Sequence, residues 1–95
     1  MGEIRALRVR YTKRALRQMT AILAYIGERS PKGAQNVRAG LQAVIDRLGD
    51  HPYSGQATGK GDMRRAVANP YPYLIFYRVT AEGVTVHRVR HAARR

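Results

Sequence analysis

The sequence predicts an α+β domain in which an antiparallel sheet carries an N-terminal helical hairpin on one side, in the order βααβββ. Apolar residues recur at three- and four-residue spacing through the first half of the chain, and short strand-like runs occupy the second half. Between them lies a loop over 49–61 that holds four glycines and Pro52. The 95 residues leave room for a single domain, 1–95, and no repeat or linker divides them.

The first half of the chain reads as one strand followed by two helices. Apolar and basic residues alternate over 5–11, which is typical of a half-buried strand. Thr12 is placed to cap a helix that runs to about Arg29, and Ser30-Pro31 restarts the chain because Ser caps a helix and Pro fits its first turn. The second helix is expected to end at Gly49. So short a break between two helices predicts an antiparallel hairpin.

Each predicted helix carries one apolar stripe for packing against the sheet. The stripe of the first helix consists of Leu16, Met19, Ile22, Leu23 and Ile26. The stripe of the second helix consists of Val37, Leu41, Val44, Ile45 and Leu48. These residues are the candidate core on the helical side.

Three strands are expected after the loop, over 63–68, 73–79 and 83–89. Residues 73–77 are apolar on both faces, which indicates a central strand. In the last strand Val84 and Val86 share a face, whereas Val89 falls on the other. Either a β-bulge shifts the alternation or the strand loses its burial at that point.

The charge balance limits the classes of partner. Eighteen Lys and Arg residues against six Asp and Glu give a formal net charge of +12. Most of the basic residues are arginine, whose planar guanidinium suits phosphates and carboxylates, so a polyanionic or acidic partner is expected. An arginine-rich composition also arises in GC-rich genomes without any such partner.

Composition also excludes several kinds of site. The chain has no cysteine, which removes disulfides, zinc–thiolate sites and a cysteine nucleophile and fits a reducing cytosol. No secretory leader is apparent, and the longest apolar run, 21–26, is far too short for a membrane span. The expected location is cytoplasmic, with no membrane partner.

Three patterns that could suggest an enzyme or a metal site do not meet the requirements of that chemistry. The glycine loop 55–61 misses the P-loop spacing, lacks the hydroxyl residue after its lysine and precedes a strand instead of a helix. His87 and His91 have no cysteine or clustered carboxylates to complete a metal shell, so neither a metal nor a cofactor is expected. Ser30 and Ser54 are interpreted as cap and turn residues and not as nucleophiles.

Basic and aromatic residues concentrate from residue 60 onward, and strands about 4.8 Å apart would bring them together. Arginine can hold a scissile phosphate, histidine can transfer protons near neutral pH and tyrosine can stack on a base, which together suffice for metal-free RNA cleavage by 2′-hydroxyl attack. The residues alone favour a simpler interpretation, with aromatics in the core and arginines on an acidic partner. The candidate target- or partner-binding residues are Arg64, Arg65, Tyr71, Tyr73, Arg78, Arg88, Arg90, His91 and Arg94.

Two segments resemble the RelE/ParE superfamily of bacterial toxins: Tyr-Pro-Tyr-Leu-Ile-Phe-Tyr-Arg-Val at 71–79 and Val-His-Arg-Val-Arg-His-Ala-Ala-Arg at 86–94. Val-Arg-Tyr-Thr at 9–12, before the first helix, agrees with this resemblance, as does Arg64, seven residues before Tyr71. The resemblance covers nearly the whole chain, and its motifs are specific when taken together. It implies the βααβββ fold of that superfamily.

The resemblance further implies the toxin of a type II toxin–antitoxin system. Such a toxin arrests growth, serves in plasmid stabilization and is neutralised by a cognate antitoxin with an acidic or amphipathic segment. It would reach operator DNA only through the antitoxin. We expect the antitoxin to cover both the helical hairpin and the sheet, because it must shield charge and apolar surface together.

Members of this superfamily differ in their target. RelE-like members cut mRNA on the ribosome, and this pattern would make Arg64, His91 and Arg94 catalytic. ParE-like members inhibit DNA gyrase and need no hydrolytic site. No tyrosine follows Arg94, although some of the ribonucleases have one there, and the Tyr-Pro-Tyr and His-Ala-Ala-Arg motifs are closer to ParE. Gyrase inhibition is therefore the favoured expectation, and a ribosome-dependent mRNA endonuclease is the alternative.

Overall fold

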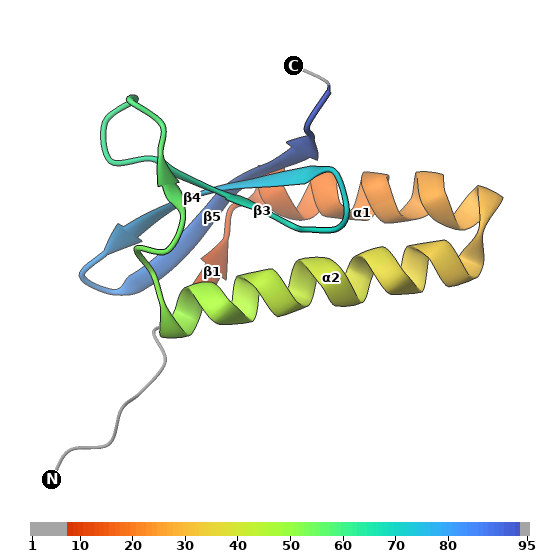
Figure 1. The fold of residues 1–95 in the computed structure, drawn as a ribbon, viewed down its shortest axis with the longest axis horizontal. Helices are drawn as coiled ribbons and strands as arrows, with labels where there is room; N and C mark the ends of the chain where they lie inside the picture. The colour runs from red at the N-terminus through yellow and green to blue at the C-terminus, as the bar shows by residue number, and fades with distance from the viewer. Residues whose placement is uncertain (1–7, 94–95) are drawn as a thin grey trace, which may run out of the picture.

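The computed structural model describes residues 8–93, in which a helical hairpin covers one side of a mixed five-stranded sheet (Figure 1). The elements are β1 (Val9–Tyr11), α1 (Lys13–Arg29), α2 (Pro31–Asp50), β2 (Gln56–Ala57), β3 (Arg64–Val67), β4 (Tyr73–Thr80) and β5 (Gly83–His91). The predicted α+β class and helical hairpin are confirmed. Residues 5–7 of the predicted first strand lie outside the described residues. Neither helix of the described part is long and apolar enough to span a membrane.

The strands lie in the order β1-β5-β4-β3-β2, which confirms that the strand with two apolar faces, β4, is central. The sheet differs from the prediction in two respects. β1 runs parallel to β5, and no tight turn joins these two strands, so local sequence does not set their relative direction. Within the predicted loop, β2 adds a short antiparallel pairing to β3, in which Gln56 lies opposite Arg65.

Both predicted helix caps are present. The Thr12 side chain accepts a hydrogen bond from the backbone N–H of Ala15 at 3.0 Å, and the Ser30 side chain accepts one from Gly33 at 2.9 Å. The second helix extends one residue past the predicted end at Gly49. Gly49 is buried and lies within the helix, so it does not form the left-handed cap that was expected, and His51 is the C-cap residue.

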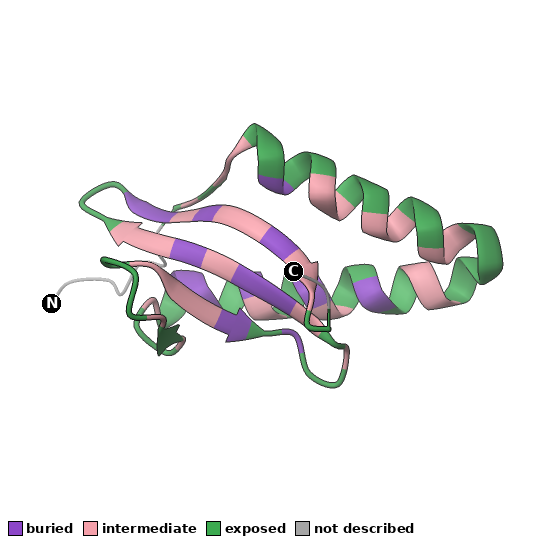
Figure 2. Cartoon of the chain, turned by 90° about the horizontal axis from the view of Figure 1, so that it is seen from above, coloured by how far each residue is buried: buried purple, intermediate pink, exposed green. Residues whose placement is uncertain are grey.

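The core lies between the hairpin and the inner face of the sheet. Its buried members are Ala15, Val37, Leu41, Ile45, Leu48, Ala66, Ala68, Ile75, Tyr77, Val84, Val86 and Val89. The far end of the hairpin, around the connection between α1 and α2, extends beyond the strands (Figure 2). The predicted stripe of α2 is largely buried, whereas that of α1 is not: Leu16 is 49% exposed, and the other four residues of that stripe are only partly buried against the core. The surface of the sheet opposite the helices is left uncovered.

A β-bulge interrupts the pairing of β4 with β5. Tyr77 lies opposite Val86 and Phe76 lies opposite Arg88, so His87 is the extra residue on β5. Val89 returns to the core and is 1% exposed. Of the two alternatives that the sequence left open, the bulge is confirmed.

The start of α1 holds this bulge in place. The backbone N–H of Thr12 donates to the oxygen of Val86, and its hydroxyl donates to the oxygen of His87, both at 3.0 Å. Further along α1, the Gln18 side-chain oxygen accepts the N–H of Val89 at 2.8 Å. These contacts satisfy backbone groups that β1 is too short to reach. They also fix which side chains of β5 face away from the helices.

Candidate functional site

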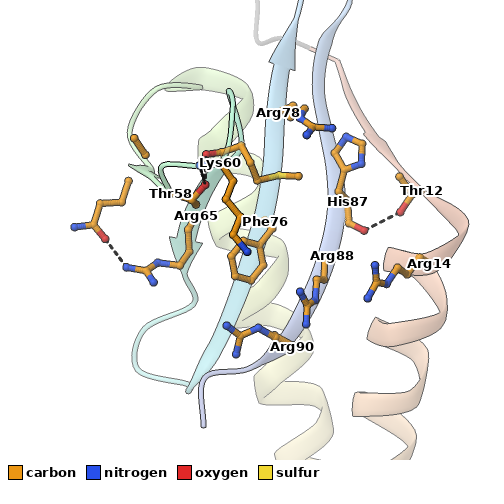
Figure 3. A pocket seen from close by; sticks show the side chains of 13 residues that line it. Thr12, Arg14, Thr58, Lys60, Arg65, Phe76, Arg78, His87, Arg88 and Arg90 are labelled. Atoms are coloured by element: carbon orange, nitrogen blue, oxygen red, sulfur yellow. Dashed lines mark hydrogen bonds between the residues drawn. The ribbon is translucent and has the colours of Figure 1, made fainter. Parts of the chain in front are cut away.

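The face of the sheet opposite the helices is hollowed into a groove of about 760 Å³ (Figure 3). We call it the open-face groove. Its lining residues are Thr12, Arg14, Gln56, Ala57, Thr58, Lys60, Met63, Arg65, Phe76, Arg78, His87, Arg88 and Arg90. None of the described residues that line it is acidic, so the groove is strongly cationic.

The centre of the groove is a row of three residues on adjacent strands. Arg65 on β3 lies opposite Phe76 on β4, which in turn lies opposite Arg88 on β5. Directly paired residues project to the same face of a sheet, so an aromatic ring sits between two guanidinium groups. Arg90, which lies two residues after Arg88 on β5 and opposite Leu74, also reaches the ring. The β-bulge makes this row possible, because it keeps Arg88 and Arg90 outward while Val86 and Val89 stay in the core.

Contacts within the row leave hydrogen-bonding capacity unused. The guanidinium carbons of Arg88 and Arg90 lie 5.7 and 5.2 Å from the centre of the Phe76 ring. Arg65 donates to the side-chain oxygen of Gln56 at 2.6 Å. The Nε atoms of Arg65 and Arg88 are shielded from solvent, and neither finds an acceptor among the described residues. A bound anion would supply such acceptors.

A loop over 58–63 forms one wall of the groove and brings in Lys60 (Figure 3). Gly59 and Gly61 have φ values of +80° and +58°, which glycine adopts without strain, and so they turn the chain sharply on either side of Lys60. The Thr58 hydroxyl donates to the oxygen of Met63 at 2.9 Å and closes the loop at its base.

Charge pairing in and around the groove is sparse. Arg78 forms an ion pair with Asp62 at 2.8 Å. Within residues 8–93, no carboxylate pairs with the other basic groups that define the walls and floor, namely Arg14, Lys60, Arg65 and Arg88. Like charges held this close repel one another, so an anionic ligand would stabilise the arrangement.

His87 lies in the groove as the bulge residue. Partial burial is the largest cause that lowers the pKa of His87. The positive charge of Arg78 lowers this pKa further, whereas the negative charge of Asp62 raises it. The imidazole is therefore uncharged at neutral pH. It offers a hydrogen-bond donor and an acceptor to the groove and adds no positive charge.

Four of the predicted site residues converge in the open-face groove: Arg65, Arg78, Arg88 and Arg90. Arg64 does not, because it shares the inner face with its partner Tyr77. Its guanidinium donates to the backbone oxygens of Tyr53 and Gly55, both at 3.2 Å. Arg64 thus supports the loop that follows α2.

The predicted tyrosines and His91 also lie on the helical side of the sheet. Tyr71 packs so closely against Gly40 of α2 that a Cβ there would come within 2.7 Å of its ring. Tyr73 lies opposite His91, and their rings meet edge to face with centres 5.4 Å apart. The Nδ1 atom of His91 accepts the N–H of Ala93 at 3.0 Å. Arg94, the ninth predicted residue, lies outside the described residues.

The structure does not bring Arg64 and His91 together. Their partners on β4, Tyr77 and Tyr73, are four residues apart. Two strand spacings of about 4.8 Å and four residues of about 3.3 Å place the two Cα atoms roughly 16 Å apart. Hydrogen bonds hold both side chains to local backbone at that separation. In this arrangement the two side chains do not contact one phosphate together.

The groove residues that sequence reasoning did not select as site residues include Arg14, Lys60, Phe76 and His87. Phe76 alternates with the core residues Ile75 and Tyr77, so the two-faced pattern of β4 already placed it outward. The β-bulge, which was one of the two alternatives for the last strand, would also have placed His87 and Arg88 on one face. Arg14 and Lys60 had no comparable signal, because helix and loop positions depend on the tertiary fold. Within residues 8–93, no three His, Asp or Glu side chains gather closely enough to bind a metal.

Known proteins match both the sequence and the fold. A family model described as "ParE toxin of type II toxin-antitoxin system, parDE" matches residues 9–95. Toxin RelE2 of Caulobacter vibrioides is 40% identical over 84 residues, which are 88% of this chain and 93% of that protein. Putative toxin Y4kP of Sinorhizobium fredii is 36% identical over 85 residues, 90% of this chain and 88% of that protein.

A solved structure described as the chromosomal ParDE TA system from P. aeruginosa has a TM-score of 0.80 and covers 90% of this chain and 96% of that one. Its sequence identity is 15%, so it bears on the fold alone. The fold that the sequence resemblance implied is thus confirmed. The chain belongs to the family of ParE toxins of type II toxin–antitoxin systems, within the RelE/ParE superfamily.

Proposed function

We propose that this toxin arrests growth by inhibiting DNA gyrase, as a binding protein without hydrolytic activity, and that its cognate antitoxin neutralises it. The observation that carries the proposal is the separation of Arg64 from His91, at roughly 16 Å between Cα atoms. A ribonuclease that relied on these residues would need both within reach of one phosphate. The match of the ParE family model to residues 9–95 supports the same choice.

Membership in a type II system implies an antitoxin partner, and we place its amphipathic segment on the helical hairpin. A groove of about 540 Å³ runs between α1 and α2, with Leu16, Met19, Leu23 and Leu41 among its lining residues. Leu16 is 49% exposed, which is unusual for a leucine that faces other apolar side chains. An amphipathic helix that covers this groove would bury that surface.

The alternative function is ribosome-dependent cleavage of mRNA. Two similar proteins of Caulobacter vibrioides are named Toxin RelE2 and Toxin RelE1. One structural feature favours this alternative: His87, an uncharged imidazole, lies in a groove with Arg78 and Arg88. A general base beside guanidinium groups is chemically suited to activate a 2′-hydroxyl. His87, and not His91, would then be the residue to test.

The two functions are separated by expressing the toxin without its antitoxin and recording two readouts from the same culture. Plasmid topology reports gyrase activity, and the 5′ ends of cellular mRNA report cleavage. We expect relaxed plasmid to accumulate before growth stops, with no new 5′ ends. The variants His91→Ala and His87→Ala should arrest growth as the wild type does. Intact supercoiling with new mRNA ends that vanish in either variant would overturn the proposal.

A further inference from the structure

We propose that α1 is the contact surface of a two-fold symmetric toxin dimer, in which Arg17 of each copy pairs with Glu28 of the other across small residues. Four residues of α1 carry the contact, and we call them the α1 strip: Arg17, Ala21, Ala24 and Glu28. The partner is a second copy of this chain. Dimerisation of the free toxin does not depend on its action on gyrase.

The α1 strip is a straight line of exposed residues on the outer side of the helix. Its members follow one another at intervals of four, three and four residues, which places them on one helical face. Among the described residues of α1 only Ala15 is buried, and the rest of the helix is half-buried or exposed (Figure 2). The strip is therefore free to receive another helix.

The middle of α1 is neutral, which is unusual for this protein. No charged residue occurs over 18–27, although 25% of the chain is charged and its net charge is +12. Two copies of so basic a chain repel each other wherever arginines meet, so a close contact between copies needs a neutral surface. The α1 strip supplies one, with a single charge of each sign at its two ends.

The strip is complementary to itself when a second copy is reversed. An antiparallel α1 whose two-fold axis passes between Ile22 and Leu23 sets Arg17 opposite Glu28 and Ala21 opposite Ala24, and the symmetry repeats each contact. The spacing of the strip is that of an antiparallel helix pair, and alanine side chains let the two helix axes approach to about 8 Å. No residue of the strip then faces a like charge.

Both charged ends of the strip are available for a partner. Among the described residues no carboxylate pairs with Arg17. Glu28 meets Arg29 at 3.8 Å, and its side chain is 77% exposed, so this is a loose surface pair that is easily exchanged. An acidic helix from another protein would also pair with Arg17, but it would set like charge against Glu28. The strip therefore fits a second copy better than an acidic segment.

A groove beside the strip would receive an aromatic ring from the other copy. Tyr25 is 51% exposed, and Arg29 covers one face of its ring at 3.8 Å from the ring centre. In the antiparallel pair the ring lies over Gln18 and Ala21 of the other copy. These two residues line a groove of about 560 Å³ between α1 and the end of β5, so the contact buries part of Tyr25 in each copy.

The contact is short, which sets its strength. From Arg17 to Glu28 the helix rises by roughly 17 Å, so the buried area falls at the low end of specific interfaces. We expect a dissociation constant of about 10–100 μM. Sedimentation velocity of the purified full-length toxin, from about 1 to 500 μM at about 150 mM salt, covers both monomer and dimer at such an affinity.

Charge exchange tests the proposed pairing. Arg17→Glu and Glu28→Arg should each weaken the dimer by about 10-fold or more, because each reversal creates two like-charge contacts. The double variant should restore the affinity to within about 3-fold of the wild type. Arg47→Glu is the matched control, since it changes the net charge as Arg17→Glu does but lies on α2 beside β3. It should not weaken the dimer. Circular dichroism confirms the fold of each variant.

The register is tested by disulfide formation, because the chain has no cysteine of its own. Ala21→Cys is mixed with ¹⁵N-labelled Ala24→Cys under mild oxidation, and the products are identified by mass. The mixed disulfide should exceed the half of the product that random pairing gives, since Ala21 of one copy lies opposite Ala24 of the other.

Four results would overturn the proposal. One is a wild type that stays monomeric at every concentration, and another is a double variant that dimerises as weakly as the single variants. The third is a loss of affinity in Arg47→Glu equal to that in Arg17→Glu, which would show a diffuse charge effect. The fourth is random disulfide pairing. None of these measurements contains gyrase, so each outcome leaves the plasmid topology test of gyrase inhibition unaffected.

Discussion

Tyr77→Phe removes one oxygen atom and tests how the loop after α2 is held to the sheet. The Tyr77 hydroxyl donates to the backbone oxygen of Pro52 at 2.8 Å and accepts the N–H of Gly55 at 2.9 Å. The ring is fully buried, and phenylalanine keeps its packing. Position 55 is fitted to this contact, because a Cβ there would overlap the hydroxyl. The substitution therefore isolates two hydrogen bonds.

The expected cost of Tyr77→Phe is about 2 kcal/mol, from two bonds worth about 1 kcal/mol each. In a chain of 95 residues, this lowers the melting temperature by about 8–16 °C. Urea unfolding followed by circular dichroism measures this loss of stability. The m-value should stay unchanged, because the substitution hardly alters the surface that unfolding exposes. Tyr53→Phe is the control, since Tyr53 is 66% exposed. A loss below about 0.5 kcal/mol for Tyr77→Phe, equal to that of a surface substitution, would refute the anchoring role.

Three further substitutions probe the sheet. Gln18→Leu leaves the N–H of Val89 without an acceptor and should cost about 1–3 kcal/mol in urea unfolding, whereas an unchanged midpoint would mean that water replaces the amide. Gly83→Ala should cost about 1–3 kcal/mol, because Gly83 has a φ of +134° and a Cβ would overlap the oxygen of Arg8; a neutral result would show that β1 can shift. The pKa of His87 is lowered in the folded state, so the unfolded chain binds its proton more tightly and stability falls as pH drops through the ordinary histidine range near 6.5. Thermal unfolding from pH 7.5 to 5 should therefore show a steeper loss for the wild type than for His87→Gln, and parallel curves would contradict this assignment.

Much of the fold was predictable because local patterns determine it. The caps at Thr12 and Ser30 and the hairpin between them follow from residue types at helix ends. The parallel pairing of β1 with β5 was not predictable from such patterns, since these strands are distant in sequence and no turn links them. β2 is only two residues long and exposed, so it has no apolar pattern to reveal it.

The candidate site was only partly predictable, for a related reason. Composition drew attention to the arginines of the last three strands, but it cannot tell which face each one occupies. Arg64 and Arg65 are neighbours in sequence and project to opposite faces. The bulge at His87 changes the alternation of β5, so face assignments beyond it depend on knowing that it is there. Phe76 belongs to a run that is apolar on both faces, and this pattern gave no sign that the ring would lie among guanidinium groups on an uncovered face.

The most direct test of the central claim is supercoiling of relaxed plasmid by purified gyrase, measured against increasing concentrations of the purified toxin. We predict a concentration-dependent loss of supercoiling that an equimolar amount of the cognate antitoxin restores. His91→Ala should inhibit as strongly as the wild type, since inhibition by binding needs no chemical step from this residue. Full supercoiling at toxin concentrations that cut mRNA in a ribosomal translation reaction would contradict the claim.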